Sequence, residues 1–174
     1  MTENIIGNNG KIDDKRMIKC VVFDLDDTLW LPNKAPAANF ERANALRPYI
    51  LELRKDGYFL AVASFNVEAQ SVIDLFFPNA FDLVVSAQHP DDALSHNKLP
   101  MLQRIRKTYA RRMLEKGRHT KLKWIEMIFF DDSYDVINRM RAERPTLTVC
   151  EVNDKTGITK KSIESHLKSQ SVSQ

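Results

Sequence analysis

Short apolar runs alternate along this chain with segments whose apolar residues recur every three or four positions. Continuous apolarity, in place of strict alternation, suits strands that are buried on both faces. Such strands are predicted at residues 18–23, 58–64, 81–86, 127–130 and 146–152. Amphipathic segments predict helices around residues 48–56, 67–76, 98–115, 133–143 and 159–168. This order predicts an α/β protein with a three-layer, Rossmann-like, doubly wound parallel sheet.

The segment between the first strand and the first helix has a different composition. Residues 31–44 are rich in proline and small side chains and are predicted to be irregular. Such a segment can be a loop that rises over a site or an ordinary surface excursion. Pro48 suits the first turn of the helix that follows, and Gly57 suits its end.

At 174 residues, the chain has the length of one compact domain. We expect a flexible leader at residues 1–16, the domain at 17–170 and a short tail at 171–174. No apolar run approaches the ~20 residues that cross a bilayer, and the polar start lacks the apolar stretch of a secretory signal. The sequence therefore predicts an intracellular, most simply cytoplasmic, protein without a membrane partner.

Charge is unevenly distributed along the chain. Residues 98–123 carry ten lysines or arginines and one acid, a net +9, whereas the whole chain has a formal charge of +3. Arg104, Lys107 and Arg111 fall on one face of the predicted helix. A segment of this kind can bind a polyanion such as nucleic acid, or it can simply be solvated. Both interpretations stay open.

The clearest chemical signal is the sequence VVFDLDDTLW at residues 21–30, in which an apolar strand ends in three acids. Crowded carboxylates repel one another unless a cation compensates them, and oxygen ligands favour Mg²⁺ over softer metals. Alternation along an extended chain places Asp24 and Asp26 on one side, about 6.6 Å apart. Asp24 can then attack a phosphorus atom while Asp26 acts as general acid and base. Asp27 is expected to be a turn or cap residue, and the Thr28 hydroxyl is expected to bond to the backbone.

The D-x-D-x-T pattern that follows the apolar strand resembles the first motif of the haloacid dehalogenase superfamily of phosphohydrolases. This resemblance implies three further motifs, and candidates occur in the expected order. The second motif is a strand that ends in Ser or Thr, and LAVASF supplies Ser64. Its hydroxyl would hold a phosphoryl oxygen, with Asn66 nearby at a helix start, where free N–H groups favour anions.

The third and fourth motifs complete the resemblance. The third is a lysine at a helix start, and Lys98 would offset the charge of the carboxylates and of the phosphoryl group. The fourth is a strand that ends in acids, as in MIFFDDSYDVI. Asp131 would bind the metal directly, and Asp132 would be a second ligand or would orient metal-bound water. Asp135 is an alternative to Asp132.

The resemblance covers about residues 17–168 and implies a spatial strand order of 5-4-1-2-3. Mg²⁺ would then be held by the Asp24 and Asp131 side chains and by the backbone carbonyl of Asp26. Larger relatives insert a cap domain between motifs, but only 35 residues separate Thr28 from Ser64 here, and 33 separate Ser64 from Lys98. Within the superfamily, FDLDDTLW, FFDD and GITKKSIESHL resemble the magnesium-dependent acid phosphatase group, so we expect a capless enzyme.

The sequence therefore predicts a Mg²⁺-dependent phosphomonoester hydrolase that forms an aspartyl phosphate on Asp24. An open, capless site suits phosphotyrosine, a phosphoprotein or a small phosphorylated metabolite. A polynucleotide 3′-phosphatase that uses the basic segment 98–123 is an alternative. A non-catalytic binding module of the same fold is another, although a module of this kind has no reason to hold so many carboxylates together.

Overall fold

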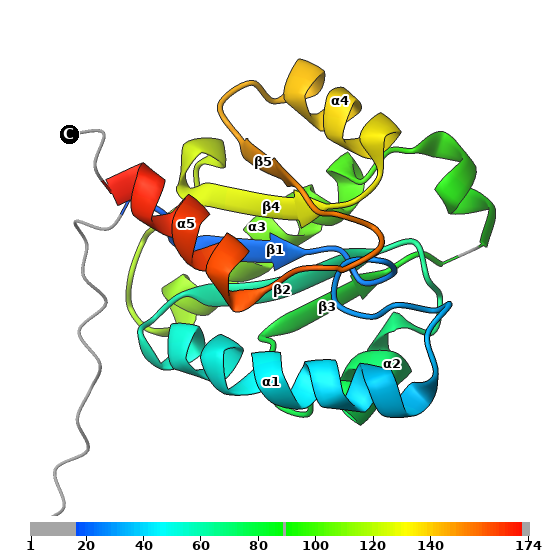
Figure 1. The fold of residues 1–174 in the computed structure, drawn as a ribbon. Coiled ribbons are helices and arrows are strands. Elements are labelled where there is room, and N and C mark those ends of the chain that lie inside the picture. The colour runs from blue at the N-terminus through cyan, green and yellow to red at the C-terminus, as the bar shows by residue number, and fades with distance from the viewer. Residues whose placement is uncertain (1–16, 89, 172–174) are drawn as a thin grey trace, which may run out of the picture.

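One parallel sheet of five strands forms the centre of the protein (Figure 1). The computed structural model describes residues 17–88 and 90–171, so the predicted leader at 1–16 and residues 172–174 of the predicted tail lie outside the described residues. The spatial order is β3-β2-β1-β4-β5, which is the predicted order read from the opposite edge. The strands are β1 (Cys20–Phe23), β2 (Phe59–Ser64), β3 (Leu83–Ser86), β4 (Met127–Asp131) and β5 (Thr148–Glu151).

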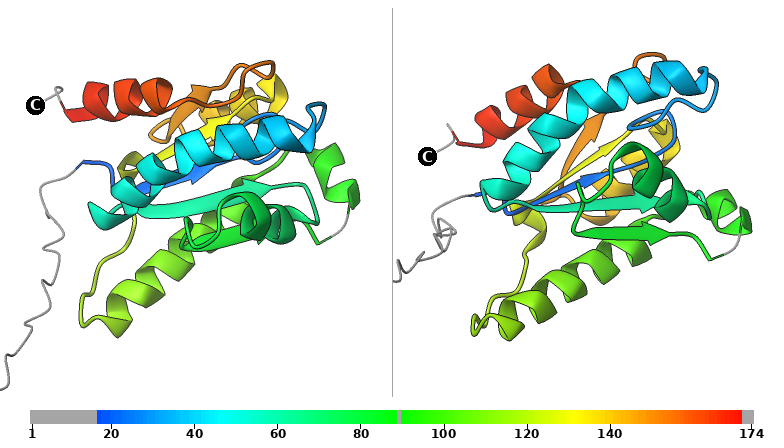
Figure 2. Two further views of the ribbon diagram at one scale, coloured as in Figure 1. Left: turned by 60° about the horizontal axis from the view of Figure 1, so that its bottom comes forward. Right: turned by 90° about the horizontal axis from the view of Figure 1, so that it is seen from below.

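Helices cover both faces of the sheet and complete the three predicted layers. The α-helices are α1 (Pro36–Lys55), α2 (Ala69–Phe76), α3 (Leu99–Glu115), α4 (Tyr134–Glu143) and α5 (Lys160–Ser171). Two short 3-10 helices are η1 (Pro90–Ser95) and η2 (Trp124–Glu126). The core on one face joins the strands to α1, α2 and α5, and the core on the other joins them to α3 and α4. Figure 2 shows α1 and α5 on the side of the sheet opposite α3.

The central strand explains why its sequence is continuously apolar. Val21 and Phe23 belong to the core under α1, whereas Cys20 and Val22 belong to the core under α3. Both faces of β1 are therefore buried, and each of its residues has to be apolar. The same alternation fills the other inner strands, and the doubly wound fold predicted from these runs is confirmed.

Helix α1 corrects the prediction for residues 31–44. The helix begins at Pro36 and continues through Pro48 to Lys55, so only residues 31–35 are irregular. Pro48 lacks an N–H group and leaves the carbonyl of Asn44 without its helical partner. Both residues are exposed, so water can satisfy that carbonyl and the helix continues. Pro36 takes the first-turn position that was predicted for Pro48.

Buried Asn39 on α1 holds the segment that follows β1. Its side-chain oxygen accepts a hydrogen bond from the Leu31 N–H, and its side-chain nitrogen donates to the Leu31 carbonyl, both at 2.9 Å. The residue is only 3% exposed. This pair of bonds replaces a strand partner for Leu31 and fixes the path of the chain between β1 and α1.

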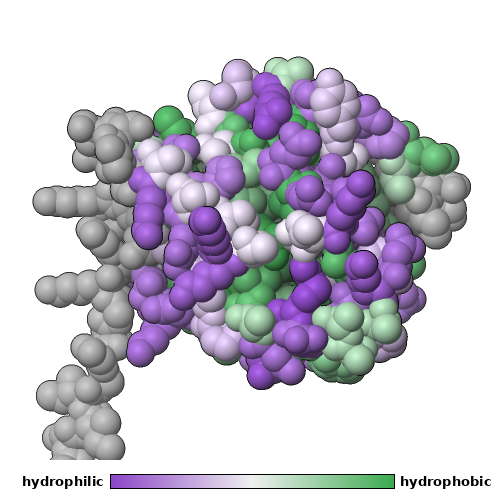
Figure 3. All heavy atoms as spheres, viewed as in Figure 1, coloured by the Kyte–Doolittle hydropathy of each residue, from purple (hydrophilic) through white to green (hydrophobic). Residues whose placement is uncertain are grey.

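The outer surface of the α1 and α5 layer is mainly hydrophilic. In Figure 3, hydrophilic side chains cover most of this face. The pocket between the two helices is lined by Leu53 and Leu167 together with charged side chains such as Glu52. Within residues 17–88 and 90–171, no helix combines the length and the apolarity that crossing a membrane requires.

Candidate active site

The carboxyl ends of three adjacent strands bring the predicted site residues together. Asp24 directly follows β1, Ser64 is the last residue of β2 and Asp131 is the last residue of β4. The register pairs Phe23 with Phe130, and the Asp24 N–H donates to the Phe130 carbonyl at 2.8 Å. In open parallel sheets, ligands bind beyond this edge of the strands. The acids of the first and fourth motifs are therefore neighbours.

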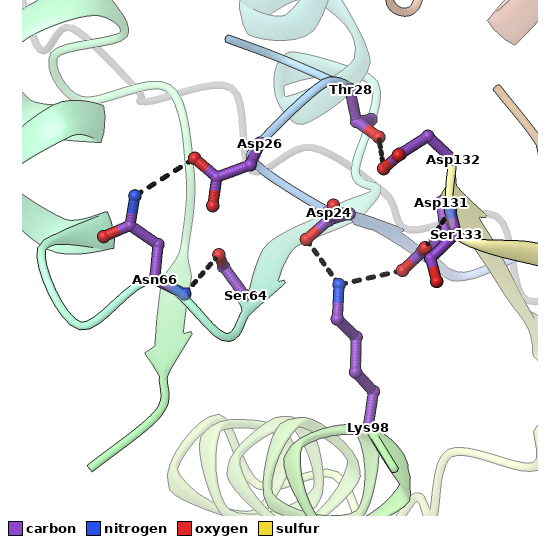
Figure 4. Close-up of polar contacts among 9 residues, drawn as sticks. All are labelled: Asp24, Asp26, Thr28, Ser64, Asn66, Lys98, Asp131, Asp132 and Ser133. Atoms are coloured by element: carbon purple, nitrogen blue, oxygen red, sulfur yellow. Dashed lines mark hydrogen bonds and ion pairs between the residues drawn. The ribbon is translucent and has the colours of Figure 1, made fainter. Parts of the chain in front are cut away.

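Lys98 lies between the two acids (Figure 4). Its ammonium group donates to a carboxylate oxygen of Asp24 and to one of Asp131, the latter at 2.8 Å. Lys98 is 2% exposed, Asp24 6% and Asp131 0%, so all three charges are buried. The rings of Phe65 and Phe129 lie 5.2 and 5.7 Å from the ammonium nitrogen. Because Lys98 immediately precedes α3, its predicted place at a helix start is confirmed.

Burial changes the protonation behaviour of this trio. Burial raises the pKa of Asp24 to about 6, although Lys98 acts in the opposite direction. Burial likewise raises the pKa of Asp131 to about 6, again against Lys98. Burial alone would lower the pKa of Lys98, but the two carboxylates outweigh it and raise the pKa overall. Lys98 therefore stays charged and compensates the acids only in part.

Three carboxylates are close enough to share one cation. Ligand oxygens of Asp24, Asp131 and Asp132 all lie within 4.8 Å of one another. The Ser133 N–H donates to Asp131 at 2.8 Å and fixes the orientation of that side chain. A set made only of carboxylate oxygens suits a hard divalent cation. Asp135 is exposed in the first turn of α4 and lies outside this group, so the structure places Asp132, and not its alternative, beside Asp24 and Asp131.

Asp26 lies apart from these three carboxylates and has a different partner. Its carboxylate accepts a hydrogen bond of 3.0 Å from the side-chain amide of Asn66 (Figure 4). The Asn66 N–H in turn donates to the hydroxyl oxygen of Ser64 at 3.0 Å, and Ser64 is fully buried. One chain of contacts therefore joins Asp26 to the end of β2. Asn66 was predicted at a helix start, but its side-chain oxygen caps a turn at Glu68, and α2 begins only at Ala69.

The turn after Asp24 differs from the prediction at Thr28. Its hydroxyl was expected to bond to the backbone, but it donates to the carboxylate of Asp132 at 3.4 Å. This happens because β1 and β4 are neighbours, so the turn that follows β1 faces the end of β4. Asp27 lies in the turn as expected, with a φ of 55°, a left-handed conformation that Asp tolerates better than most residues.

Two side chains near the site were missed by the sequence interpretation. Phe65, which follows Ser64, packs beside the Lys98 ammonium group. Arg42 on α1 donates to the backbone carbonyls of Thr28 and Thr156 and so connects the turn after Asp24 to the segment after β5. The position of Phe65 after a motif residue could have suggested its role. Nothing in the sequence pattern distinguishes Arg42 from other helical arginines.

Comparison with known proteins shows a shared fold. No family model matches the chain, and no curated protein matches it in sequence. The N-terminal part of the protein BF1531 from Bacteroides fragilis, which contains a phosphatase domain and was crystallised in complex with Mg, resembles it with a TM-score of 0.56 and 17% identity. The similarity covers 87% of this chain but 40% of the other. The chain therefore has an α/β fold that also occurs in a magnesium-bound phosphatase structure.

Proposed function

We propose that this protein is a Mg²⁺-dependent phosphomonoester hydrolase with Asp24 as its nucleophile. The observation that carries the proposal is the buried Lys98 held between Asp24 and Asp131 at the carboxyl edge of the sheet. Burying three charged groups together costs free energy, and clusters of this kind occur preferentially at functional sites. Their position at the edge where such sheets bind ligands favours a catalytic purpose.

The acids fit a magnesium ion. Asp24, Asp131 and Asp132 would hold it, because their oxygens already lie within 4.8 Å of one another. The backbone carbonyl of Asp26 is a further proposed ligand. When bound, Mg²⁺ would neutralise negative charge on the phosphoryl group and on the carboxylates. The fold shared with a magnesium-bound phosphatase domain supports this assignment.

The side chains divide the reaction between them. The Asp24 carboxylate attacks phosphorus, the bond from phosphorus to the leaving oxygen breaks, and Asp26 gives that oxygen a proton. Asp26 then takes a proton from water, the water oxygen attacks phosphorus, and the bond to Asp24 breaks. Inorganic phosphate leaves and both carboxyl groups return to their starting states.

The neighbours of these two acids have supporting roles in the proposal. The Asn66 amide orients Asp26, to which it donates at 3.0 Å. The Ser64 hydroxyl accepts the Asn66 N–H, which leaves its own hydrogen available for a phosphoryl oxygen. Lys98 compensates the negative charge that gathers around phosphorus.

The proposed family is the capless part of the haloacid dehalogenase superfamily. The four motif positions meet at one edge of the sheet, which supports this assignment. Within the described residues, α1 is the one regular element between β1 and β2, and the segment from Ser64 to Lys98 holds α2, β3 and the short η1. Neither connection has room for a cap domain, so the site would stay open to solvent and to substrates of different sizes.

The experiment measures phosphate release from p-nitrophenyl phosphate with and without Mg²⁺. We expect Mg²⁺-dependent turnover by the wild type and a loss of at least about 10³-fold in Asp24→Asn. Asp135→Asn is the matched control, because it removes a nearby exposed carboxylate outside the proposed site and should keep full activity. Rapid acid quenching followed by mass spectrometry should find a phosphoryl group on the peptide that contains Asp24. Normal turnover by Asp24→Asn would overturn the proposal.

A further inference from the structure

A cavity of about 280 Å³ opens beside the proposed phosphoryl site, between the end of β3 and the start of α3. We propose that it binds the leaving group of the substrate, and that this leaving group is a small apolar or aromatic unit that carries a second anion. The inference rests on the proposed function and deepens it. Its lining includes Phe65, Ser86, Ala87, Pro100, Met101 and Arg104.

The cavity shares a wall with the catalytic edge. Phe65 lines it and also lies 5.2 Å from the Lys98 ammonium nitrogen. The Ala87 N–H donates to the Ser64 carbonyl at 2.9 Å, which joins the cavity floor to the residue proposed to hold a phosphoryl oxygen. A phosphate that contacts Ser64 and Lys98 therefore has this cavity as an immediate neighbour for the group attached to it.

The lining determines which leaving group fits. Phe65, Pro100 and Met101 offer apolar contact surface, as the walls of small-molecule sites commonly do. A volume of about 280 Å³ is near the small end of ligand pockets, which span roughly 300–1,000 Å³. One ring or a short branched chain fits this description better than a large leaving group does.

Arg104 supplies the cation that would recognise a second anion. It lines the cavity and is exposed, and it makes no ion pair with a carboxylate of residues 17–88 or 93–170. Arg104 and Phe65 line the same cavity, and the Phe65 ring lies 5.2 Å from the Lys98 ammonium nitrogen. A guanidinium group can bind a carboxylate through two parallel hydrogen bonds. An anion on the leaving group could therefore meet Arg104 inside the cavity that adjoins the proposed phosphoryl site.

Lys107 is a suitable control position for Arg104. It lies three residues further along the same helix and is also exposed, but it lines a different cavity together with Gln103 and Lys121. Removing Lys107 therefore changes the charge of the protein as much as removing Arg104 does, without changing the wall of the proposed leaving-group site.

The test compares kcat/KM for phenyl phosphate and 4-carboxyphenyl phosphate in the presence of Mg²⁺. We expect the wild type to prefer the carboxylated ester by roughly tenfold, which is the low end for a hydrogen bond to a charged group. Arg104→Gln should bring the ratio close to one, and Lys107→Gln should keep the wild-type ratio. Ser86→Leu, which narrows the cavity, should lower kcat/KM for phenyl phosphate by about tenfold relative to acetyl phosphate, whose leaving group is too small to fill it.

The outcomes separate this inference from the function on which it rests. Hydrolysis of phenyl phosphate that depends on Asp24 but shows no preference for the carboxylated ester overturns the inference and leaves the proposed function intact. A preference that survives Arg104→Gln but disappears in Lys107→Gln also overturns it, because the basic surface as a whole would then be responsible. If the wild type hydrolyses p-nitrophenyl phosphate but none of these three compounds, only this inference is wrong; if it hydrolyses none of the four, both proposals are wrong.

Discussion

Replacing Lys98 by Met should destabilise the metal-free protein far more than an ordinary surface substitution does. The two side chains have similar shapes, so the change removes a charge and little volume. It leaves Asp24 and Asp131 facing each other without a cation, at side-chain exposures of 8% and 0%. Each must then either stay ionised in a buried place or take up a proton.

The size of the effect follows from the two ion pairs. Opposite charges at 4 Å attract by about 4 kcal/mol at an effective dielectric constant of 20, and Lys98 takes part in two such contacts. Removing Lys98 also removes the unfavourable desolvation of its ammonium group, which offsets part of this loss. Breaking a buried pair by removing one partner costs about 3–5 kcal/mol in measured cases. We expect the free energy of unfolding of Lys98→Met to fall by that amount.

Urea unfolding at a pH of about 7.5 in the presence of EDTA measures this change. Lys107→Met is the control, because it makes the same substitution at an exposed position of α3 and should lie within about 0.5 kcal/mol of the wild type. Added Mg²⁺ should narrow the difference between Lys98→Met and the wild type, since a cation bound to the carboxylates replaces the missing charge. Equal stability of the two variants in EDTA would refute the reasoning.

Two further predictions follow from the same structure. The pKa of Asp24 and that of Asp131 are raised to about 6 in the folded protein, so folding favours the protonated form of each group. Their contribution to the stability of the metal-free protein is therefore complete below a pH of about 4 and is lost as the pH rises through 6. Mg²⁺ needs the ionised forms, so the rise in Tm on adding Mg²⁺, measured by thermal unfolding, should be present at a pH of about 7.5 and nearly absent at about 5; an equal rise at both would contradict this. Asn39→Ala should lose about 2–3 kcal/mol of unfolding free energy in urea titrations, because both backbone groups of Leu31 lose their partner. Asn44→Ala on the exposed face of the same helix should change little, and an equal loss in both variants would show that the Leu31 contacts do not matter.

The sheet was predictable from the sequence because its signal is strong and local. A parallel strand buried on both faces needs apolar residues at nearly every position, so it appears in the sequence as a continuous apolar run, such as CVVF or FLAVAS. The ends of these runs then indicate where polar side chains gather. For this reason the sequence predicts that Asp24, Ser64 and Asp131 lie at one edge of the sheet.

Features that depend on tertiary contacts could not be predicted in the same way. Helix α1 passes through Pro48 because water can reach the carbonyl that this residue leaves without a partner. Whether that carbonyl is exposed depends on the folded structure and cannot be predicted from the local sequence. The spacing of Ala43, Leu46, Ile50 and Leu53 does carry the helical period, and greater weight on that spacing would have extended the helix. The Thr28 and Asn66 side chains bond to residues of neighbouring strand ends, so local sequence rules gave Thr28 the wrong partner and gave Asn66 none.

The place of β1 in the sheet has a consequence for the order of events during synthesis. Of the five strands of this sheet, β1 is synthesised first and lies in the middle, and its second neighbour, β4, is synthesised about a hundred residues later. Until then, β1 is an edge strand of the partial sheet β3-β2-β1, and a bare edge is a surface on which nascent chains are prone to associate wrongly. During this interval Asp24 also lacks its neighbour Asp131, which is the last residue of β4. The group of Asp24, Lys98 and Asp131 therefore cannot form until β4 has been synthesised.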